Sequence, residues 1–150
     1  MSTFIHGGSA LVLDIAGKAH AALNKGDVVQ IDPFVTSLED GYTTRVPDLT
    51  NADGQLAPIG VVLGSAGKKS FAVGEDVLIR ILGVVDVNFS NTNVIGRSCQ
   101  LQDGAMTVAD TGGVAFLADA ANTRVCGISH TEGSGAHQSK VFFNGLTTWG

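Results

Sequence analysis

The chain has 150 residues, the length of one ordinary domain or of two small lobes that share a core. Charged residues make up only 15% of it, the formal net charge is -5, and the densest basic run is the pair Lys68-Lys69, so we expect no nucleic-acid partner. Its apolar stretches are far shorter than the roughly 20 residues that a membrane-spanning helix needs, so we expect no membrane partner either.

Short β-branched or apolar runs, bounded by Gly, Pro, Asp or Asn, follow one another along the chain and predict strands. The 20 glycines between and within them predict many tight turns and no long helix. The predicted strands are Val28 to Ile31, Ile59 to Leu63, Val77 to Leu82, Val84 to Phe89, Cys99 to Leu101, Met106 to Val108, Val114 to Leu117, Val125 to Ile128 and Val141 to Phe143. The sequence therefore predicts an all-β protein, a compact β-barrel or β-sandwich of jelly-roll or tulip-like form with long loops.

Three segments depart from this pattern. Lys18 to Leu23, which is rich in Ala, and Phe116 to Asn122 are the windows in which one or two helical turns stay open as an alternative. The stretch from Pro33 to Pro58 has little periodicity and contains turn residues such as Asp53-Gly54. Because so long a loop in a compact domain is often functional, we interpret it as an excursion that reaches a partner or as a peripheral hairpin.

A weak internal repeat with a period of about 70 residues runs through the chain. Gly26 to Asp32 resembles Gly96 to Gln102, and Ile59 to Val62 resembles Cys126 to Ser129. In each half a strand, a long loop, a Gly-centred strand, a Gly turn and a further strand follow in the same order. We therefore expect a single β domain over residues 1–150, with two pseudo-repeats (about 24–89 and 94–146) and with N- and C-terminal arms.

Two cysteines are present, Cys99 and Cys126. In the repeat alignment Cys99 takes the place of Val29, and Cys126 takes the place of Ile59. A free Cys behaves as a small hydrophobe in such a place, and thiols stay reduced in a cytoplasm. We therefore favour two buried thiols over a disulfide pair, with no redox or metal role.

The segment Gly64 to Ser70 comes nearest to a phosphate-binding loop. Its first Gly stands two positions too late, and Lys69 occupies the place where Ser or Thr must hold the metal. We interpret the segment as an exposed turn with solvated lysines. A calcium loop around Asp53-Gly54 fails as well, because Leu49 would stand at the first ligand position and Gly60 at the twelfth, where a Glu is required.

The histidines and serines provide no catalytic motif. His130 and His137 lie on a Gly-rich stretch with Glu132 between them, which would make at most a fortuitous metal site, and we interpret both as polar loop residues. Ser134 lies between two glycines, but not with the spacing of a nucleophile elbow. We therefore expect no enzymatic activity, no catalytic residue, no cofactor and no metal.

Aromatic and apolar residues near the chain ends raise the question of an interface. Phe4-Ile5 and Trp149 lie where chains usually fray, so docking on a neighbour, packing into the chain's own core and disorder stay open for them. Trp is enriched among the residues that anchor interfaces. The candidate interface residues are Phe4, Ile5, Phe34, Tyr42 and Trp149.

Three blocks follow one another between residues 24 and 89. They are Gly26-Asp27-Val28-Val29, then Pro58-Ile59-Gly60-Val61-Val62, then the run from Gly74 to Val87. This order of a Gly-Asp-x-Val strand, a Gly-Val strand and a strand that continues through Gly-Val resembles the small phage capsid cement, or decoration, proteins. The resemblance implies a β-barrel or β-sandwich that forms a homotrimer, sits where capsomers meet and bridges neighbouring major capsid subunits.

A low surface charge fits extensive burial against such neighbours. The N-terminal residues lack the positive charge of a secretory signal, so we expect manufacture in the host cytoplasm and a final place on the capsid surface of the virion. Three alternatives stay open. They are another virion component, such as a head fibre base or a tail protein, a trimeric β-rich enzyme such as a nucleotide hydrolase, and a carbohydrate-binding module that presents Tyr42 and Trp149.

Overall fold

The computed structural model describes residues 11–32, 42–45, 58–90, 92–96, 98–102, 105–108 and 123–146. Every helix or strand in these ranges is a β-strand, which confirms the all-β prediction. The strands are β1 (Leu13–Ala19), β2 (Leu23–Asn24), β3 (Val28–Asp32), β4 (Tyr42–Arg45), β5 (Ile59–Leu63), β6 (Ser70–Phe71), β7 (Asp76–Phe89), β8 (Ser98–Gln102), β9 (Ala105–Val108), β10 (Thr123–Ser129) and β11 (His137–Asn144). In the same ranges no helix is long and apolar enough to cross a membrane.

β7 is one strand of 14 residues where the sequence predicted two. Gly83 was expected to separate them. Its φ of +127° lies in a region that glycine adopts easily and other residues rarely do, so the chain can bend there without leaving the sheet. The side chains that alternate into the interior on both sides of the bend are Val77, Ile79, Ile81, Val85, Val87 and Phe89.

The helical alternative is wrong for Lys18 to Leu23. Lys18 and Ala19 end β1, and Leu23 begins β2. β1 pairs with β7, and this pairing, together with the burial of Ala19, outweighs the helix propensity of the Ala-rich window. The second window, Phe116 to Asn122, and the predicted strand at residues 114–117 lie outside the described residues.

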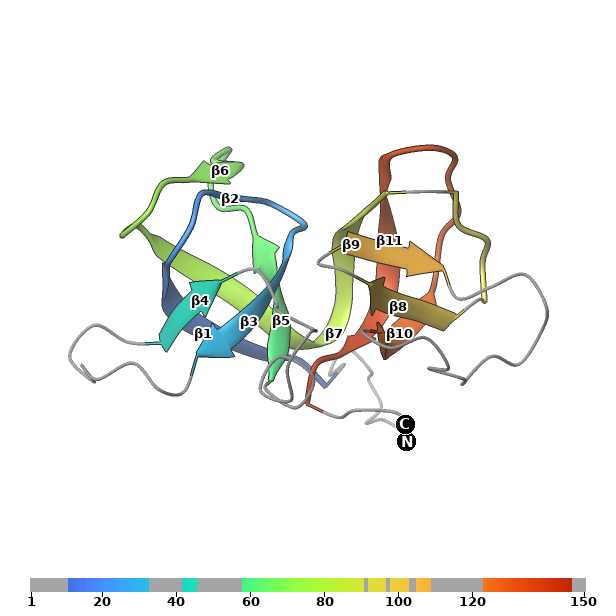
Figure 1. The fold of residues 1–150 in the computed structure, drawn as a ribbon, viewed down its shortest axis with the longest axis horizontal. Coiled ribbons are helices and arrows are strands. Elements are labelled where there is room, and N and C mark those ends of the chain that lie inside the picture. Colours follow the sequence, from blue (N-terminus) through green and yellow to red (C-terminus); the bar gives the residue numbers. More distant parts are fainter. Residues whose placement is uncertain are drawn as a thin grey trace, which may run out of the picture.

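The strands close into two rings that share β7 (Figure 1). In the first ring the order is β1, β4, β3, β5 and β7, and a β1–β7 pairing closes it. In the second ring the order is β7, β9, β8, β10 and β11, and the pairing of β11 with β7 closes it. These strands correspond, in this order, to β1, β4, β3, β5 and β7 of the first ring. β1 pairs with β7 at residues 76–82, and β11 pairs with β7 at residues 82–89, so the bend at Gly83 is where β7 passes from one ring to the other.

The two rings match in strand direction and register. The β1–β4 and β7–β9 pairings are parallel, and the other pairings within the rings are antiparallel. Val29 lies opposite Gly60 in the first ring, and Cys99 lies opposite Gly127 in the second. The division into two pseudo-repeats with terminal arms stays a prediction, and these matching pairings favour it.

The described residues form two hydrophobic clusters. One occupies the first ring and consists of Ala19, Leu23, Val29, Val62, Phe71, Val77 and Ile79. The other combines side chains from the first ring (Val28, Ile59 and Val61) with Val85, Val87, Phe89, Cys99, Cys126, Val141 and Phe143. Because the second cluster draws on both rings, the rings pack against each other through a shared apolar core.

Candidate functional site

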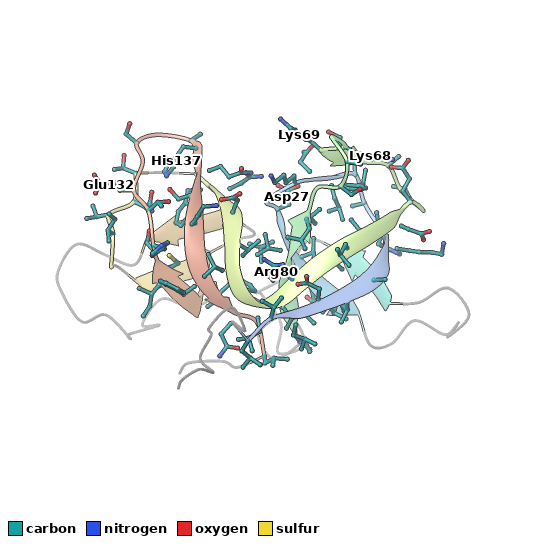
Figure 2. The ribbon with its side chains drawn as sticks, turned by 180° about the vertical axis from the view of Figure 1, so that it is seen from behind. Asp27, Lys68, Lys69, Arg80, Glu132 and His137 are labelled. Atoms are coloured by element: carbon teal, nitrogen blue, oxygen red, sulfur yellow. The ribbon has the colours of Figure 1, made fainter. Side chains whose placement is uncertain are left out.

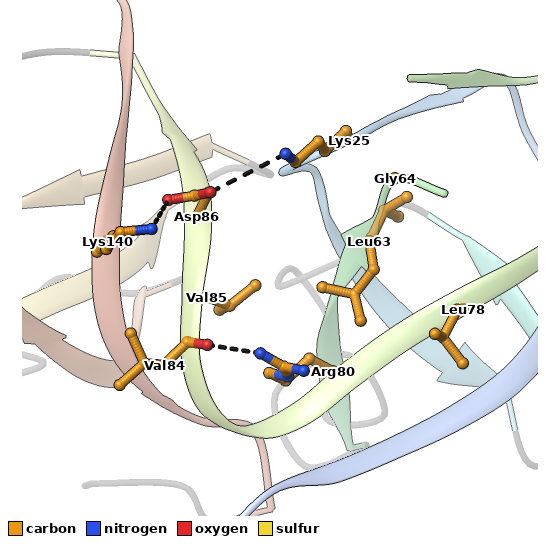
Figure 3. A pocket seen from close by; sticks show the side chains of 10 residues that line it. Lys25, Leu63, Gly64, Leu78, Arg80, Val84, Val85, Asp86 and Lys140 are labelled. Carbon is orange, nitrogen blue, oxygen red and sulfur yellow. Dashed lines mark hydrogen bonds and ion pairs between the residues drawn. The ribbon is translucent and has the colours of Figure 1, made fainter. Parts of the chain in front are cut away.

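The bend of β7 is held by the side chain of Arg80. Its Nε and Nη2 donate hydrogen bonds of 2.9 and 3.0 Å to the two carboxylate oxygens of Asp14 on β1. Its Nη1 donates to the backbone carbonyl of Val84, at 2.8 Å, on the far side of Gly83 (Figure 3). The hydrogen bond with Asp14 raises the pKa of Arg80, so the guanidinium stays charged. Because the planar guanidinium of Arg80 binds the carboxylate of Asp14 and the carbonyl of Val84 together, it holds β1 against β7 and fixes the bend.

A cleft of about 260 Å³ lies beside this bend, between the two rings. Three charged side chains lie across one end of it, Lys25 on the side of the first ring and Asp86 and Lys140 on the side of the second (Figure 3). Lys140 on β11 donates to Asp86 on β7 at 2.9 Å, and the Nζ of Lys25 lies 4.0 Å from the other carboxylate oxygen of Asp86. Two ammonium groups thus share a single carboxylate, and all three side chains are partly exposed.

The rest of the cleft is mostly apolar. Leu63 from β5, Leu78 from the first half of β7, and Val84 and Val85 from its second half line it. Leu78 is 44% exposed, so its side chain is accessible to a molecule in the cleft. The cleft therefore offers positive charge next to an apolar surface.

A second groove, of about 370 Å³, lies where the described chain begins and ends. Leu11, Leu82, Val84, Phe142 and Asn144 are among the residues that line it. Leu11 is 76% exposed and Phe142 is 50% exposed. Leu11 and Phe142 line the same groove, so a molecule that bound there would bury both apolar side chains.

A buried polar cluster occupies the interior of the second ring. Asn93, Ser129 and Ser139 are each about 98% buried or more. The amide nitrogen of Asn93 donates to the carbonyl of Thr131 at 2.7 Å and also to Ser129, and its oxygen accepts from Ser139 at 3.1 Å and from the ring of His137. His137 also stacks on Phe89.

One serine of this cluster, Ser139, lies next to His137, as a catalytic nucleophile lies next to its general base. Nε2 of His137 is 3.0 Å from the hydroxyl oxygen of Ser139. The hydroxyl, however, donates to Asn93 and is covered, and neither of the two grooves above includes it. The geometry is that of a hydrogen-bonded network that fixes side-chain positions.

The structure corrects one interpretation made from the sequence and leaves others untested. His137 is the first residue of β11 and part of this internal network, so its interpretation as a polar loop residue is wrong. His130 does lie in an exposed turn, with its ring edge-on to Phe142. Tyr42 begins β4 opposite Gly17. The other candidate interface residues, Phe4, Ile5, Phe34 and Trp149, lie outside the described residues.

The turn that resembled a phosphate-binding loop is an exposed hairpin. Ser65 and Lys68 pair across it, and Lys68 donates to Glu75 at 2.8 Å, which lowers the pKa of Glu75. Lys68 and Lys69 stand at the same end of the molecule as Glu132 and His137, away from Arg80 at the bend (Figure 2).

Both cysteines are fully buried and neither forms a disulfide, as the sequence predicted. Burial raises the pKa of Cys99 to about 12, so its thiol stays protonated and unreactive at neutral pH. Within the described ranges, no three His, Cys, Asp or Glu side chains come close enough to hold a metal ion together.

Comparisons with known proteins give one informative result. No family model matches the chain, and no curated protein sequence matches it. Among solved structures, the chain is similar to the head fiber gp8.5 N base of bacteriophage phi29, with a TM-score of 0.53 and 9% sequence identity over 89% of this chain and 95% of that chain. At this identity the likeness shows a common fold alone.

Proposed function

We propose that this protein is a structural component of a phage virion, a cement or decoration protein that binds the outside of the capsid and bridges major capsid subunits. The observation that carries the proposal is the fold, which is shared with a phage head fibre base over nearly the whole length of both chains. The sequence resemblance of residues 24 to 89 to cement proteins points to the same class of particle.

The surface supports a binding role. The groove at Leu11 and Phe142 places large apolar side chains in solvent, and such a patch is stabilised when a partner covers it. Ser139 is buried and its hydroxyl donates to Asn93, so we assign the Ser139–His137 contact a structural role. We propose that the protein forms a homotrimer, because a trimer repeats each capsid contact and gains avidity without any new chemistry.

A second candidate function is the base of a head fibre, and the fold likeness favours it specifically, since the similar structure is such a base. The two functions differ mechanically. A cement protein spans subunit boundaries and should raise the melting temperature of the head, whereas a fibre base needs only one attachment point and should leave it unchanged.

The test is to mix the purified protein with heads that lack it, and then to measure co-sedimentation and head melting. We expect saturable binding, a mass of three chains by light scattering, and a higher head melting temperature. Saturable binding without head stabilisation would favour the fibre base. Failure to bind the heads at any concentration would refute both functions.

Phe142→Asp tests which surface docks. We expect it to weaken head binding by at least about tenfold, because a charge would have to be buried in an apolar contact. The matched control is Val73→Asp, which places the same charge on an apolar residue that is 68% exposed and lies between β6 and β7, away from the groove. Equal binding by the two variants would exclude this groove as the docking surface.

A further inference from the structure

We infer that the cleft between the two rings binds an extended segment of a partner protein that carries a carboxylate side chain next to an apolar one. The inference rests on the proposed function only in taking this partner to be a capsid subunit. It concerns a different surface from the apolar groove at Leu11 and Phe142.

The charges of the cleft are unbalanced. Asp86 is the one carboxylate that the described structure places within 4.0 Å of either Lys25 or Lys140. Arg80, which also lines the cleft, is neutralised by Asp14. The charged side chains that line the cleft, together with the carboxylate of Asp14, therefore carry one excess positive charge, and a further carboxylate would pair with it.

Lys25 has hydrogen-bonding capacity to offer. Its Nζ lies 4.0 Å from Asp86, which is too long for a hydrogen bond, whereas Lys140 already donates at 2.9 Å. The carboxylate of Asp27 is not among the groups that line the cleft, and it accepts hydrogen bonds from the backbone N–H of Asn24 and from Asn88. An incoming carboxylate would thus meet an ammonium group with donors to spare.

The size and the apolar wall of the cleft define the rest of the ligand. About 260 Å³ is below the range of pockets that hold cofactors or drug-sized molecules, and it suits side chains of a bound segment. Leu63, Leu78 and Val85 provide an apolar contact beside the lysines. A nucleic acid needs more cations and an aromatic surface for stacking, and none of the described residues that line the cleft is aromatic.

The direct test is a titration of the isotope-labelled protein, followed by amide NMR shifts, with the blocked peptide acetyl-Ala-Leu-Glu-Leu-Ala-amide. We expect saturable shifts at residues of the cleft, with a dissociation constant in the millimolar range, and binding at least about fivefold weaker for the same peptide with Gln in place of Glu. Sodium acetate is the third ligand. Equal saturation by acetate would reduce the cleft to a simple anion site and overturn the inference, as would equal binding of the two peptides.

Variants of opposite sign separate recognition from misfolding. The pair Lys25→Glu and Lys140→Glu should abolish the shifts, whereas Lys68→Glu with Lys69→Glu, at the far hairpin, should leave them unchanged. Asp86→Asn removes the competing carboxylate, so it should tighten binding of the Glu peptide by about threefold. A destabilised protein would not bind more tightly, and weaker binding by Asp86→Asn would contradict the inference.

Binding to heads distinguishes this inference from the proposed function. Heads that bind the natural protein and the Lys25→Glu, Lys140→Glu variant equally well would refute the cleft while leaving the capsid function intact. A protein that binds the Glu peptide but no heads would retain the cleft and refute the capsid function.

Discussion

The two rings have the same strand order, yet their open ends are closed in different ways. In the first ring the short pair β2–β6 places Leu23 opposite Phe71, and both side chains are buried in an apolar cluster. In the second ring Asn93 bridges to Gly133 at the corresponding place, and a hydrogen-bonded cluster with His137 fills the space. Strand pairing thus sets the ring, and the interior can be apolar or polar if every polar group has a partner.

The difference extends to the facing strands. Val62 and Val77 of the first ring correspond, by strand pairing, to Ser129 and Ser139 of the second. Both serines are buried and both bond to Asn93. We call Leu23 with Phe71 the apolar plug of the first ring, and Asn93 with its hydrogen-bond partners the polar plug of the second. The apolar plug tolerates small errors of fit, whereas the polar plug is destabilised when a single hydrogen-bond partner is removed. Exchanging the plugs between the rings is therefore the sharpest way to test this comparison.

The largest effect is expected for Leu23→Asn, which puts the polar plug into the apolar ring. The variant loses the burial of a Leu and leaves an amide without partners, so the free energy of unfolding should fall by about 4 kcal/mol. Urea unfolding followed by circular dichroism measures it. A loss below about 1 kcal/mol would mean that the first ring can accommodate a polar plug as the second does.

The reverse exchange, Asn93→Leu, should cost less, about 2 kcal/mol, because the new side chain gains burial while Ser129, Ser139 and His137 lose hydrogen bonds. Adding Ser129→Val and Ser139→Val should regain part of this loss, since valines occupy the equivalent positions of the first ring. Urea midpoints of the single and triple variants decide the matter. A triple variant that is less stable than the single one would show that the second ring is shaped for its polar cluster.

The smallest effect concerns pH and compares Cys99 with Val29. Below about pH 9 the thiol is protonated in both the folded and the unfolded chain, so it adds no pH dependence. Above pH 9 the unfolded thiol ionises, while the folded one, with a pKa of about 12, keeps its proton. This thiol should therefore lower the stability by up to about 1.4 kcal/mol per pH unit between pH 9 and 12.

Cys99→Val removes this contribution. We expect the loss of stability between pH 9 and 10.5 to be shallower in the variant than in the natural protein, with little difference between pH 6 and 8. Thermal unfolding at a series of pH values measures the stability of the two proteins in both pH ranges. Parallel curves up to pH 10.5 would mean that Cys99 ionises in the folded state as easily as in the unfolded state.

Much of the strand pattern could be predicted from the sequence, because β-branched runs end at Gly, Asn or Pro. β5 has the predicted bounds, and β3, β8 and β10 contain the predicted runs. β1 was missed since its two buried positions, Gly17 and Ala19, are small and carry little hydrophobic signal. β4 was missed because it is short and polar, and only its pairing with β3 and β1 makes it a strand.

The candidate sites could not be predicted from the sequence. Lys25 and Lys140 stand near opposite ends of the chain and share Asp86 only because β7 is common to both rings. Asn93, Ser129 and His137 likewise meet through strand pairing, and no spacing in the sequence connects them. Local patterns specify strands and turns, whereas the closing of the rings decides which side chains become neighbours.

The continuous course of β7 has a consequence for how the chain folds. Its first half completes the ring that β1 opens, and its second half is the strand on which the other ring is built. During synthesis the first ring can close once residue 82 is available, but the second must wait for β11, so the half of β7 beyond Gly83 is a temporary template with an open edge. Since melting of the first ring would take away the anchor of that template, we expect the two rings to unfold in one cooperative transition.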